Sequence, residues 1–266
     1  MGNAVPAAAG QSELLKIEQI GAVLAVGLNR PAKRNALNDG IILAIHDCFS
    51  SLPDGIGAVV IHGVGDHFSS GLDLSELTEH DATEGLRHSQ MWHRVFDRIQ
   101  YSRVPVIAAL KGAVIGGGLE LACAAHIRVA EPSAYFALPE GQRGIFVGGG
   151  GSVRLPRLIG VARMTDMMLT GRVYSATEGA AYGFSQYLTE AGGALPKAME
   201  LAERVAANAP LTNFAVLQAL PMIAEANPQA GLLMESLMAT VAQSDKEAKR
   251  RIRAFLDRKT AKVKPS

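Results

Sequence analysis

A glycine-rich turn between two apolar runs is the feature that constrains this chain most. Residues 111–120 read Lys-Gly-Ala-Val-Ile-Gly-Gly-Gly-Leu-Glu, after a strand-like run at 104–110 and before an alanine-rich run at 121–125. The pattern predicts a strand, a tight turn and a helix. Successive glycines let backbone amides approach a ligand closely, and a helix start adds partial positive charge there. In the first turn of that helix, Glu120 would lie beside donors for a developing negative charge, as acid–base chemistry next to a carbonyl requires.

The composition allows a well-buried core and excludes several classes of protein. The chain has 266 residues, of which 48% are hydrophobic and 19% charged, enough for one large domain or a domain with an appendage. A net charge of +1 gives no basic field for nucleic acid. Cys48 and Cys123 lie in apolar segments and are expected to be reduced, buried thiols. The sequence contains no HExxH or CxxC pattern, so no metal is expected.

Neither a targeting segment nor a membrane span is expected. Residues 1–11 lack a basic region followed by an apolar one, so no signal peptide is recognised. The most apolar stretch, residues 104–125, is interrupted by Lys111, by glycines and by Glu120, which makes it a poor membrane span. We therefore expect a cytoplasmic protein.

Strand and helix patterns alternate over the first two thirds of the chain, which predicts an α/β core with mostly parallel strands. Helices are expected after Asn38 or Asp39, at 85–101 and after the glycine turn, and the pattern from residue 195 onward is helical. We predict a disordered N-terminus at 1–13, a core domain at 14–194 and a C-terminal helical region at 195–266. Strands are expected at 14–18, 22–28, 58–62, 104–110, 126–130 and 134–138.

Four features are predicted to form one site. They are the glycines 116–118, the loop Phe68-Ser69-Ser70-Gly71-Leu72-Asp73, Glu120, and Glu140 in the loop after a strand. Two backbone donors can hold a thioester oxygen as it gains enolate character, and two carboxylates can divide the addition of water between a base and an acid. Alternatively, Glu120 only favours the helix dipole, Glu140 is a solvated loop residue and the glycines serve packing.

Several segments, in their order and spacing, resemble the crotonase superfamily, also called the enoyl-CoA hydratase/isomerase family. The resemblance extends from about residue 17 to about residue 259. It implies an α/β fold, a spiral of repeated strand–strand–helix turns followed by a C-terminal helical region that builds trimers, two of which usually stack into a hexamer. The matching segments are residues 29–37, 68–74, 112–122, 136–140, 148–160 and 169–172.

The resemblance also implies roles for the site residues. The amides of Leu72 and Gly117 would form the oxyanion hole for an acyl-CoA carbonyl. Hydratases of the family carry glutamates at the positions of Glu120 and Glu140, whereas isomerases, dehalogenases and hydrolases commonly lack one. Glu120 would activate water for attack at the β-carbon and Glu140 would protonate the α-carbon, although the two roles could be shared. The Gly148 amide would help to hold the water, next to Val147 where many relatives have proline.

Coenzyme A contacts follow from the same resemblance, and no cofactor is implied because coenzyme A is part of the substrate. For Lys33 and Arg34 surface charge is an equal alternative, and Asp73 is expected mainly to order its loop. Helix 85–101 is expected to line the acyl pocket, with Met91, Trp92 and Val95 facing either the pocket or the core. His67 is expected to be structural. The expected contact residues are Lys33, Arg34, Ala36, Ser70, Asp73 and Leu74, and Phe255, Arg258 and Lys259 would pack on the coenzyme A of a neighbouring subunit.

The resemblance points to an enzyme that adds water across the 2,3 double bond of an enoyl-CoA. Overall similarity suggests methylthioacryloyl-CoA as the substrate. The alternatives are an isomerase, a hydrolase or a lyase on the same fold, or an RNA-binding member, which the net charge of +1 disfavours.

Overall fold

The computed structural model describes residues 13–76 and 81–257, so most of the N-terminus predicted to be disordered lies outside it. The chain divides into two compact units, residues 1–206 and 207–266. The first is the α/β core and the second is helical wherever it is regular. Of the residues expected to reach a neighbouring subunit, Arg258 and Lys259 lie outside the described residues, and Phe255 is an exposed residue near the end of the second unit.

A six-stranded sheet forms the base of the first unit, with strand order β1-β2-β3-β4-β6-β9. The first two strands form an antiparallel hairpin around Gly21, whose positive φ of 59° suits glycine. All other neighbours in this sheet pair in parallel, which confirms the α/β prediction. The strands are β1 (Leu15–Ile20), β2 (Val23–Leu28), β3 (Ala58–Gly63), β4 (Val106–Leu110), β6 (Ile127–Ala130) and β9 (Tyr187–Leu188).

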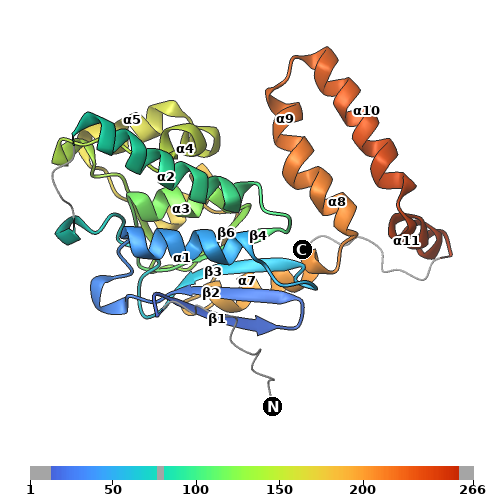
Figure 1. The fold of residues 1–266 in the computed structure, drawn as a ribbon, viewed down its shortest axis with the longest axis horizontal. Helices are drawn as coiled ribbons and strands as arrows, with labels where there is room; N and C mark the ends of the chain where they lie inside the picture. The colour runs from blue at the N-terminus through green and yellow to red at the C-terminus, as the bar shows by residue number, and fades with distance from the viewer. Residues whose placement is uncertain (1–12, 77–80, 258–266) are drawn as a thin grey trace. The chain divides into compact units, whose positions relative to one another are not determined.

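Helices cover both faces of this sheet (Figure 1). On one side lie α1 (Asp39–Ser50), α2 (Ala82–Gln100) and α3 (Gly117–Ala124), and on the other lies α7 (Ala194–Ala206). The α7 helix buries Ala198, Leu201 and Ala202 against the sheet, because these residues share one face at helical spacing. Residues 195–206 of α7 belong to the region that the sequence pattern assigned to the C-terminal helices. They pack on the sheet through the apolar face of α7, so the first compact unit extends to residue 206.

Side-chain caps fix where the long helices begin. At α1, the Asn38 side chain accepts a hydrogen bond from the Ile41 amide at 3.1 Å. The α2 helix begins three residues before the predicted position 85, because Asp81 and Glu84 form a capping box ahead of it. The position of α2 matters for the site, since its buried residues Trp92 and Phe96 lie beside the glycine-rich loops.

The predicted glycine turn contains a strand that sequence reasoning missed. β5 (Ala113–Ile115) lies between Gly112 and Gly116, both with positive φ, and pairs in parallel with β7 (Tyr135–Ala137). β8 (Tyr174–Ser175) completes this second, three-stranded sheet. Three residues of strand are too few to show a period, which explains the miss.

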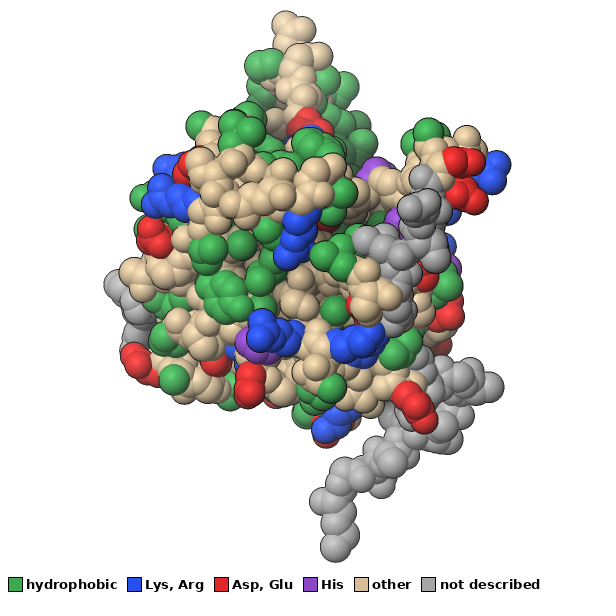
Figure 2. Space-filling model, turned by 90° about the vertical axis from the view of Figure 1, so that its left-hand side faces the viewer, with side chains coloured by type: hydrophobic (Ala, Val, Ile, Leu, Met, Phe, Trp, Pro, Cys, Tyr) green, Lys and Arg blue, Asp and Glu red, His purple; other side chains and the backbone are tan. Residues whose placement is uncertain are grey.

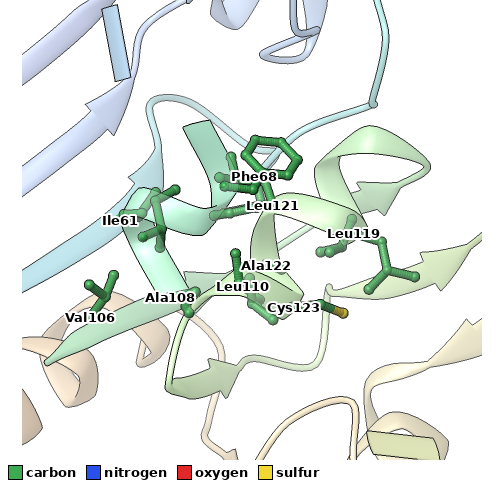
Figure 3. Packing of buried hydrophobic residues seen from close by; sticks show 14 of the residues in the cluster. Ile61, Phe68, Val106, Ala108, Leu110, Leu119, Leu121, Ala122 and Cys123 are labelled. Carbon is green, nitrogen blue, oxygen red and sulfur yellow. The ribbon is translucent and has the colours of Figure 1, made fainter. Parts of the chain in front are cut away.

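The α3 helix is buried on all sides, since every residue from Gly117 to Ala124 is buried. Figure 3 shows Leu119, Leu121, Ala122 and Cys123 of α3 in one cluster with side chains of β4 and with Phe68. Both cysteines are free; Cys123 is buried as predicted, whereas Cys48 is only partly buried, and burial raises the pKa of each thiol to about 11.

The remaining elements are short or helical. In the first unit they are η1 (Pro31–Lys33), η2 (Leu74–Glu76), η3 (Gly141–Arg143), α4 (Gly151–Ile159), α5 (Val161–Thr170) and α6 (Ala176–Tyr182). In the second unit they are α8 (Pro210–Phe214), the π-helical turn η4 (Ala215–Ala219), α9 (Leu220–Glu225), α10 (Pro228–Ser244) and α11 (Lys246–Leu256). No helix within the described ranges is long and apolar enough to cross a membrane.

Candidate active site

The loop of residues 68–73 is held in place by two short parallel bridges. Ser69 pairs with Val114 of β5, and Leu72 pairs with Leu37. At the second bridge the Leu37 amide donates to the Gly71 carbonyl and the Asp73 amide donates to the Leu37 carbonyl, both at 2.8 Å. In such a bridge the residue between those two contacts turns its own N–H away from the partner. The Leu72 amide therefore points away from Leu37 and is in no hydrogen bond between described residues.

The Gly117 amide lies beside the Leu72 amide. Residues 71 and 117 are glycines. If Gly71 carried a β-carbon, that atom would lie 3.2 Å from the Gly117 nitrogen, and a β-carbon on Gly117 would lie 3.5 Å from the Leu72 nitrogen. Gly117 opens α3, where the first amides have no partner within the helix, and none of the hydrogen bonds among described residues uses its N–H. Two free amide donors thus meet at the positive end of a helix, which is the arrangement that stabilises an oxyanion.

Glu120 is a buried carboxylate held by a second glycine-rich loop. Its side chain is 4% exposed, and its Oε1 accepts hydrogen bonds from the amides of Gly149 at 2.9 Å and Gly151 at 2.7 Å. Burial raises the pKa of Glu120 above its ordinary value, while the Gly151 and Gly149 amides act in the opposite direction. Within the described chain no hydrogen bond uses Oε2, so one carboxylate oxygen is fixed and the other is available to a small molecule.

Glu140 lies at the other side of the same helix start. A β-carbon at position 116, the N-cap of α3, would lie 2.6 Å from Oε1 of Glu140. The side chain is 7% exposed, and its Oε2 is one of three buried side-chain polar atoms in the described residues without a hydrogen-bond partner. Burial, together with the charge of Glu120, raises the pKa of Glu140 to about 7. Near neutral pH this carboxyl group can therefore hold or release a proton.

Arg154, to which the sequence analysis gave no role, supports the loop that holds Glu120. Its guanidinium donates to the Gly149 carbonyl at 2.9 Å and forms an ion pair with Asp97 of α2. The side chain is buried, and its positive charge lowers the pKa of Glu120. The sequence shows only an arginine shortly after a run of glycines, in a helix that also carries Arg157.

A buried pair, Asn35 and Ser69, supports the loop that carries Leu72. The Ser69 hydroxyl donates to the Asn35 carbonyl at 2.8 Å and accepts from the Gly71 amide at 3.2 Å. The Asn35 side chain donates to the carbonyls of Val64 and His67, and Asn35 adopts a positive φ of 54°, which asparagine tolerates better than most residues. Both residues lie in the segments that carry the family resemblance, but their positioning role was not predicted.

Comparison with known proteins identifies the family of the chain. The family model described as enoyl-CoA hydratase/isomerase matches residues 18–265. The chain belongs to the enoyl-CoA hydratase/isomerase family. It is 34% identical over 246 residues to the 2,3-dehydroadipyl-CoA hydratase of Escherichia coli, covering 91% of this chain and 95% of that protein. It is 30% identical to the short-chain-enoyl-CoA hydratase of Clostridium acetobutylicum, covering 91% and 94%.

Solved structures of the family share the fold. A crystal structure from Rhodopseudomonas palustris, assigned as an enoyl-CoA hydratase, is 80% identical and superposes with a TM-score of 0.91, covering 94% of this chain and 97% of that one. An enoyl-CoA hydratase from Bacillus anthracis is 28% identical, with a TM-score of 0.86 and coverage of 92% and 96%. The predicted crotonase-like α/β fold with a helical C-terminal region is therefore confirmed.

The residues expected from the family resemblance to contact coenzyme A lie on two adjoining segments. The Ser70 amide donates to the Arg34 carbonyl at 3.0 Å, which joins the segment 33–36 to the segment 70–74. Ala36 is buried and Leu74 is 45% exposed. The two segments thus lie side by side, and the second carries the Leu72 amide.

Asp73 orders these two segments, as the sequence analysis expected. One of its carboxylate oxygens accepts from Arg30 at 2.8 Å and from Lys33 at 3.0 Å, and the other accepts from the Ser75 hydroxyl at 2.6 Å. The Ser75 hydroxyl, the Lys33 ammonium and the Arg30 guanidinium hold the pKa of Asp73 well below its usual range. Protein donors thus occupy both carboxylate oxygens, and the Lys33 ammonium also donates to the Ser75 hydroxyl.

The remaining predicted residues fall around the two loops. The Gly148 carbonyl accepts a hydrogen bond from Ser89 of α2 at 2.7 Å, and the Gly148 amide helps to stabilise the charged form of Glu120. Val147 is buried. His67 accepts a hydrogen bond from the Ala113 amide at 3.0 Å, in agreement with the structural role expected for it.

A cavity of about 410 Å³ lies elsewhere, at the carboxyl ends of β3 and β4. His62, Lys111 and Glu131 line it together with residues at the start of α7. None of the predicted site residues lines it, so it is separate from the candidate active site. Among the described residues no group of three or more His, Cys, Asp or Glu side chains could hold a metal ion.

Proposed function

We propose that this chain hydrates the 2,3 double bond of a trans-2-enoyl-CoA. The observation that carries the proposal is the pair of buried glutamates, Glu120 and Glu140, at the start of the same helix that presents the free Gly117 amide next to that of Leu72. A water addition needs a base, an acid and donors for the enolate oxygen, and these groups supply all of them.

In the proposed reaction the thioester oxygen accepts hydrogen bonds from the Leu72 and Gly117 amides. Glu120 removes a proton from water through its free oxygen, and the resulting hydroxide bonds to the β-carbon. The double-bond electrons move onto the thioester as an enolate, and the protonated Glu140 then delivers its proton to the α-carbon. One water has been added, and the proton left on Glu120 returns to Glu140 through solvent before the next turnover.

The raised pKa of Glu140 favours its role as the acid. With a pKa of about 7, Glu140 is protonated in a large share of molecules at neutral pH, as an acid must be. Burial also raises the pKa of Glu120, and the Gly149 and Gly151 amides oppose that shift by stabilising the ionised form that a base requires. The mechanism requires no metal or redox cofactor.

Lys33 and Arg34 are the basic side chains that we propose for contact with the phosphates of coenzyme A. Figure 2 shows Lys and Arg side chains around an area of backbone and apolar side chains on one face of the molecule. We propose that coenzyme A binds along the segments 33–36 and 70–74, with its thioester at Leu72 and Gly117. Lys33 could meet a phosphate if its ammonium exchanged the half-exposed contact with Asp73 for the ligand.

The length of the acyl chain and the oligomeric state are also proposals. The similarity to a 2,3-dehydroadipyl-CoA hydratase and a short-chain-enoyl-CoA hydratase supports a short or medium acyl chain. Methylthioacryloyl-CoA is a further candidate substrate, suggested by overall resemblance alone. We also propose a trimer or hexamer in the cytoplasm. The second unit supports oligomerisation because it exposes many apolar side chains, including Leu232, Leu233 and Leu237. Light scattering would establish the oligomeric state.

The decisive test is hydration of crotonyl-CoA by the purified protein. Glu120→Gln and Glu140→Gln should each lower kcat by at least about 100-fold, because each removes an acid–base group. Glu131→Gln, which changes a buried glutamate at the separate cavity, serves as the matched control and should keep most of the activity. Full activity in either site variant would contradict the two-glutamate mechanism.

Product analysis on an acyl-CoA panel separates this function from the alternatives. A shifted double bond would indicate an isomerase, free coenzyme A a hydrolase, and carbon–carbon cleavage a lyase. RNA binding is disfavoured by the net charge of +1, and a gel shift at physiological salt would detect it.

A further inference from the structure

Two of the three buried, unpartnered side-chain polar atoms in the described chain lie at the candidate site. They are Oε2 of Glu140 and Nε1 of Trp92, and the third is the Ser185 hydroxyl. Buried polar groups in folded proteins nearly always have a partner, so an exception calls for an explanation. The unpartnered oxygen of Glu140 is explained by the proton that Glu140 transfers in the proposed reaction. No step of that reaction uses the Trp92 N–H.

Trp92 lies directly against the oxyanion donors. A β-carbon at position 117 would lie 2.9 Å from Cζ3 and 3.3 Å from Cη2 of the indole, so the six-membered ring packs on Gly117. The side chain is 4% exposed. Nε1 lies on the opposite side of the indole from Cζ3, so its N–H points away from Gly117 and does not serve the thioester oxygen.

Neighbouring residues of α2 place Trp92 relative to the rest of the candidate site. One turn further along, Phe96 packs edge-on against Trp92 and lies near Gly149, which donates to Glu120. One turn earlier, Ser89 bonds to the Gly148 carbonyl. Trp92 therefore lies near both the Leu72 and Gly117 amides and the loop that positions Glu120. With the thioester oxygen at those amides and the β-carbon near Glu120, as proposed above, Trp92 lies beside the acyl chain.

From this geometry we propose that Trp92 selects acyl chains that carry an oxygen acceptor beyond the β-carbon. The indole is a donor only, so its partner must be an acceptor, such as a carboxylate or a neutral carbonyl or ester oxygen. A purely aliphatic chain would leave the N–H unpaired, and a buried donor without a partner disfavours binding. This inference rests on the proposed acyl-CoA function and assigns a specificity residue to it.

Binding of unreactive saturated analogues tests the inference without depending on turnover. Trp92 is the only tryptophan in the chain, so intrinsic fluorescence reports on it alone. The probes form two pairs of matched length, butyryl-CoA with succinyl-CoA and hexanoyl-CoA with adipyl-CoA, and the adipyl methyl ester separates a neutral acceptor from a charged one. At least one oxygen-bearing probe should shift the emission to longer wavelength relative to its aliphatic partner.

The variant Trp92→Phe keeps an aromatic ring and removes the donor together with part of the indole volume, a loss that affects both members of each probe pair. By calorimetry, the ratio of affinities for an oxygen-bearing probe and its aliphatic partner should fall by about tenfold or more, as expected for a lost hydrogen bond to a polar or charged acceptor. Phe96→Leu is the matched control, because it removes apolar contacts without removing a donor, and should change that ratio by less than about twofold.

The two proposals fail in different ways. If aliphatic probes bind but Trp92→Phe leaves every ratio within about twofold, the inference about Trp92 is overturned and the acyl-CoA function stands. If no acyl-CoA probe binds to the wild-type protein, the proposed function is overturned and the inference with it. If Trp92→Phe lowers the ratio of affinities to hexanoyl-CoA for adipyl-CoA but not for the adipyl methyl ester, the acceptor of the Trp92 N–H is a carboxylate.

Discussion

Glu120 and Gly151 are thirty-one residues apart in the chain, and the Gly151 amide donates a hydrogen bond of 2.7 Å to the Glu120 carboxylate. This contact joins the start of α3 to the start of α4. It fixes one oxygen of the proposed base and leaves the other available to water. Glycine is required at this position, because a β-carbon on residue 151 would lie 2.7 Å from Cγ and 2.9 Å from Oε1 of Glu120.

Gly151→Ala should therefore displace the Glu120 carboxylate. We expect kcat for crotonyl-CoA to fall by at least about 100-fold, the usual contribution of a positioned acid–base group. Gly85→Ala is the control, because residue 85 lies in α2 with no atom within 4 Å of its β-carbon position. That variant should keep activity and gain about 0.5–1 kcal/mol of helix stability. Equal activity in both variants would show that catalysis does not depend on the position of the Glu120 carboxylate that Gly151 sets.

The sequence predicted the acid–base and amide residues of the candidate site better than the residues that hold them in position. Glu120, Glu140, Leu72 and Gly117 could be named because they lie in segments whose order and spacing resemble a family. The contacts that hold them join residues far apart in the sequence and leave no periodic signal: Arg154 pairs with Asp97, 57 residues earlier, and Ser69 bonds to Asn35, 34 residues earlier. The unpartnered Trp92 N–H is a property of packing, which no local pattern encodes.

Ser69→Ala tests the support under the Leu72 amide. The change leaves the buried Asn35 carbonyl and the Gly71 amide without their hydroxyl partner, which should cost about 1–3 kcal/mol of unfolding free energy. It should also lower kcat more than it raises KM, because the displaced donor serves the transition state. Urea unfolding and steady-state kinetics would measure both effects.

The adjacent Ser70 provides the control for that experiment. Its hydroxyl makes only a long contact of 3.3 Å to the Lys33 carbonyl. Ser70→Ala should therefore leave the urea midpoint nearly unchanged. A Ser69→Ala protein as stable and active as wild type would show that the buried hydroxyl does not position the Leu72 amide.

Asp73→Asn should destabilise the two segments proposed to bind coenzyme A, and the effect should depend on pH. The carboxylate charge holds Arg30 and Lys33, and its loss should cost about 1–3 kcal/mol near pH 7. The pKa of Asp73 is depressed in the folded protein, so its stabilising contribution is complete above the unfolded value of about 3.9, begins to decline below it and is lost only as pH falls through the depressed folded pKa. The difference in unfolding free energy between the wild type and the variant should therefore be largest near pH 7 and smaller, but still measurable, at pH 3. Asp54→Asn, at an exposed position, should show no such difference.

The rate of hydration should fall as pH rises through about 7. Glu140 must be protonated to act as the acid, and its pKa is raised to about 7 in the free protein. Accordingly kcat/KM, which reports groups of the free enzyme, should decline about tenfold per pH unit above that value. It should also decline at low pH, where Glu120 becomes protonated and can no longer act as the base. A pH profile flat from 6 to 9 would exclude Glu140 as the acid.

The same shift predicts that Glu140→Gln stabilises the fold at alkaline pH. A carboxyl whose folded pKa lies above its unfolded value near 4.5 stabilises most when protonated, and that contribution is lost as pH rises through about 7. Burial without a partner for Oε2 is the cause, and glutamine carries no charge to bury. After allowance for partial solvent screening, we expect wild type to lose about 2 kcal/mol of unfolding free energy between pH 5 and pH 8.5 relative to the variant. Glu203→Gln, at an exposed position of α7, should follow the wild-type curve, and a Glu140→Gln curve parallel to wild type would show that Glu140 is solvated.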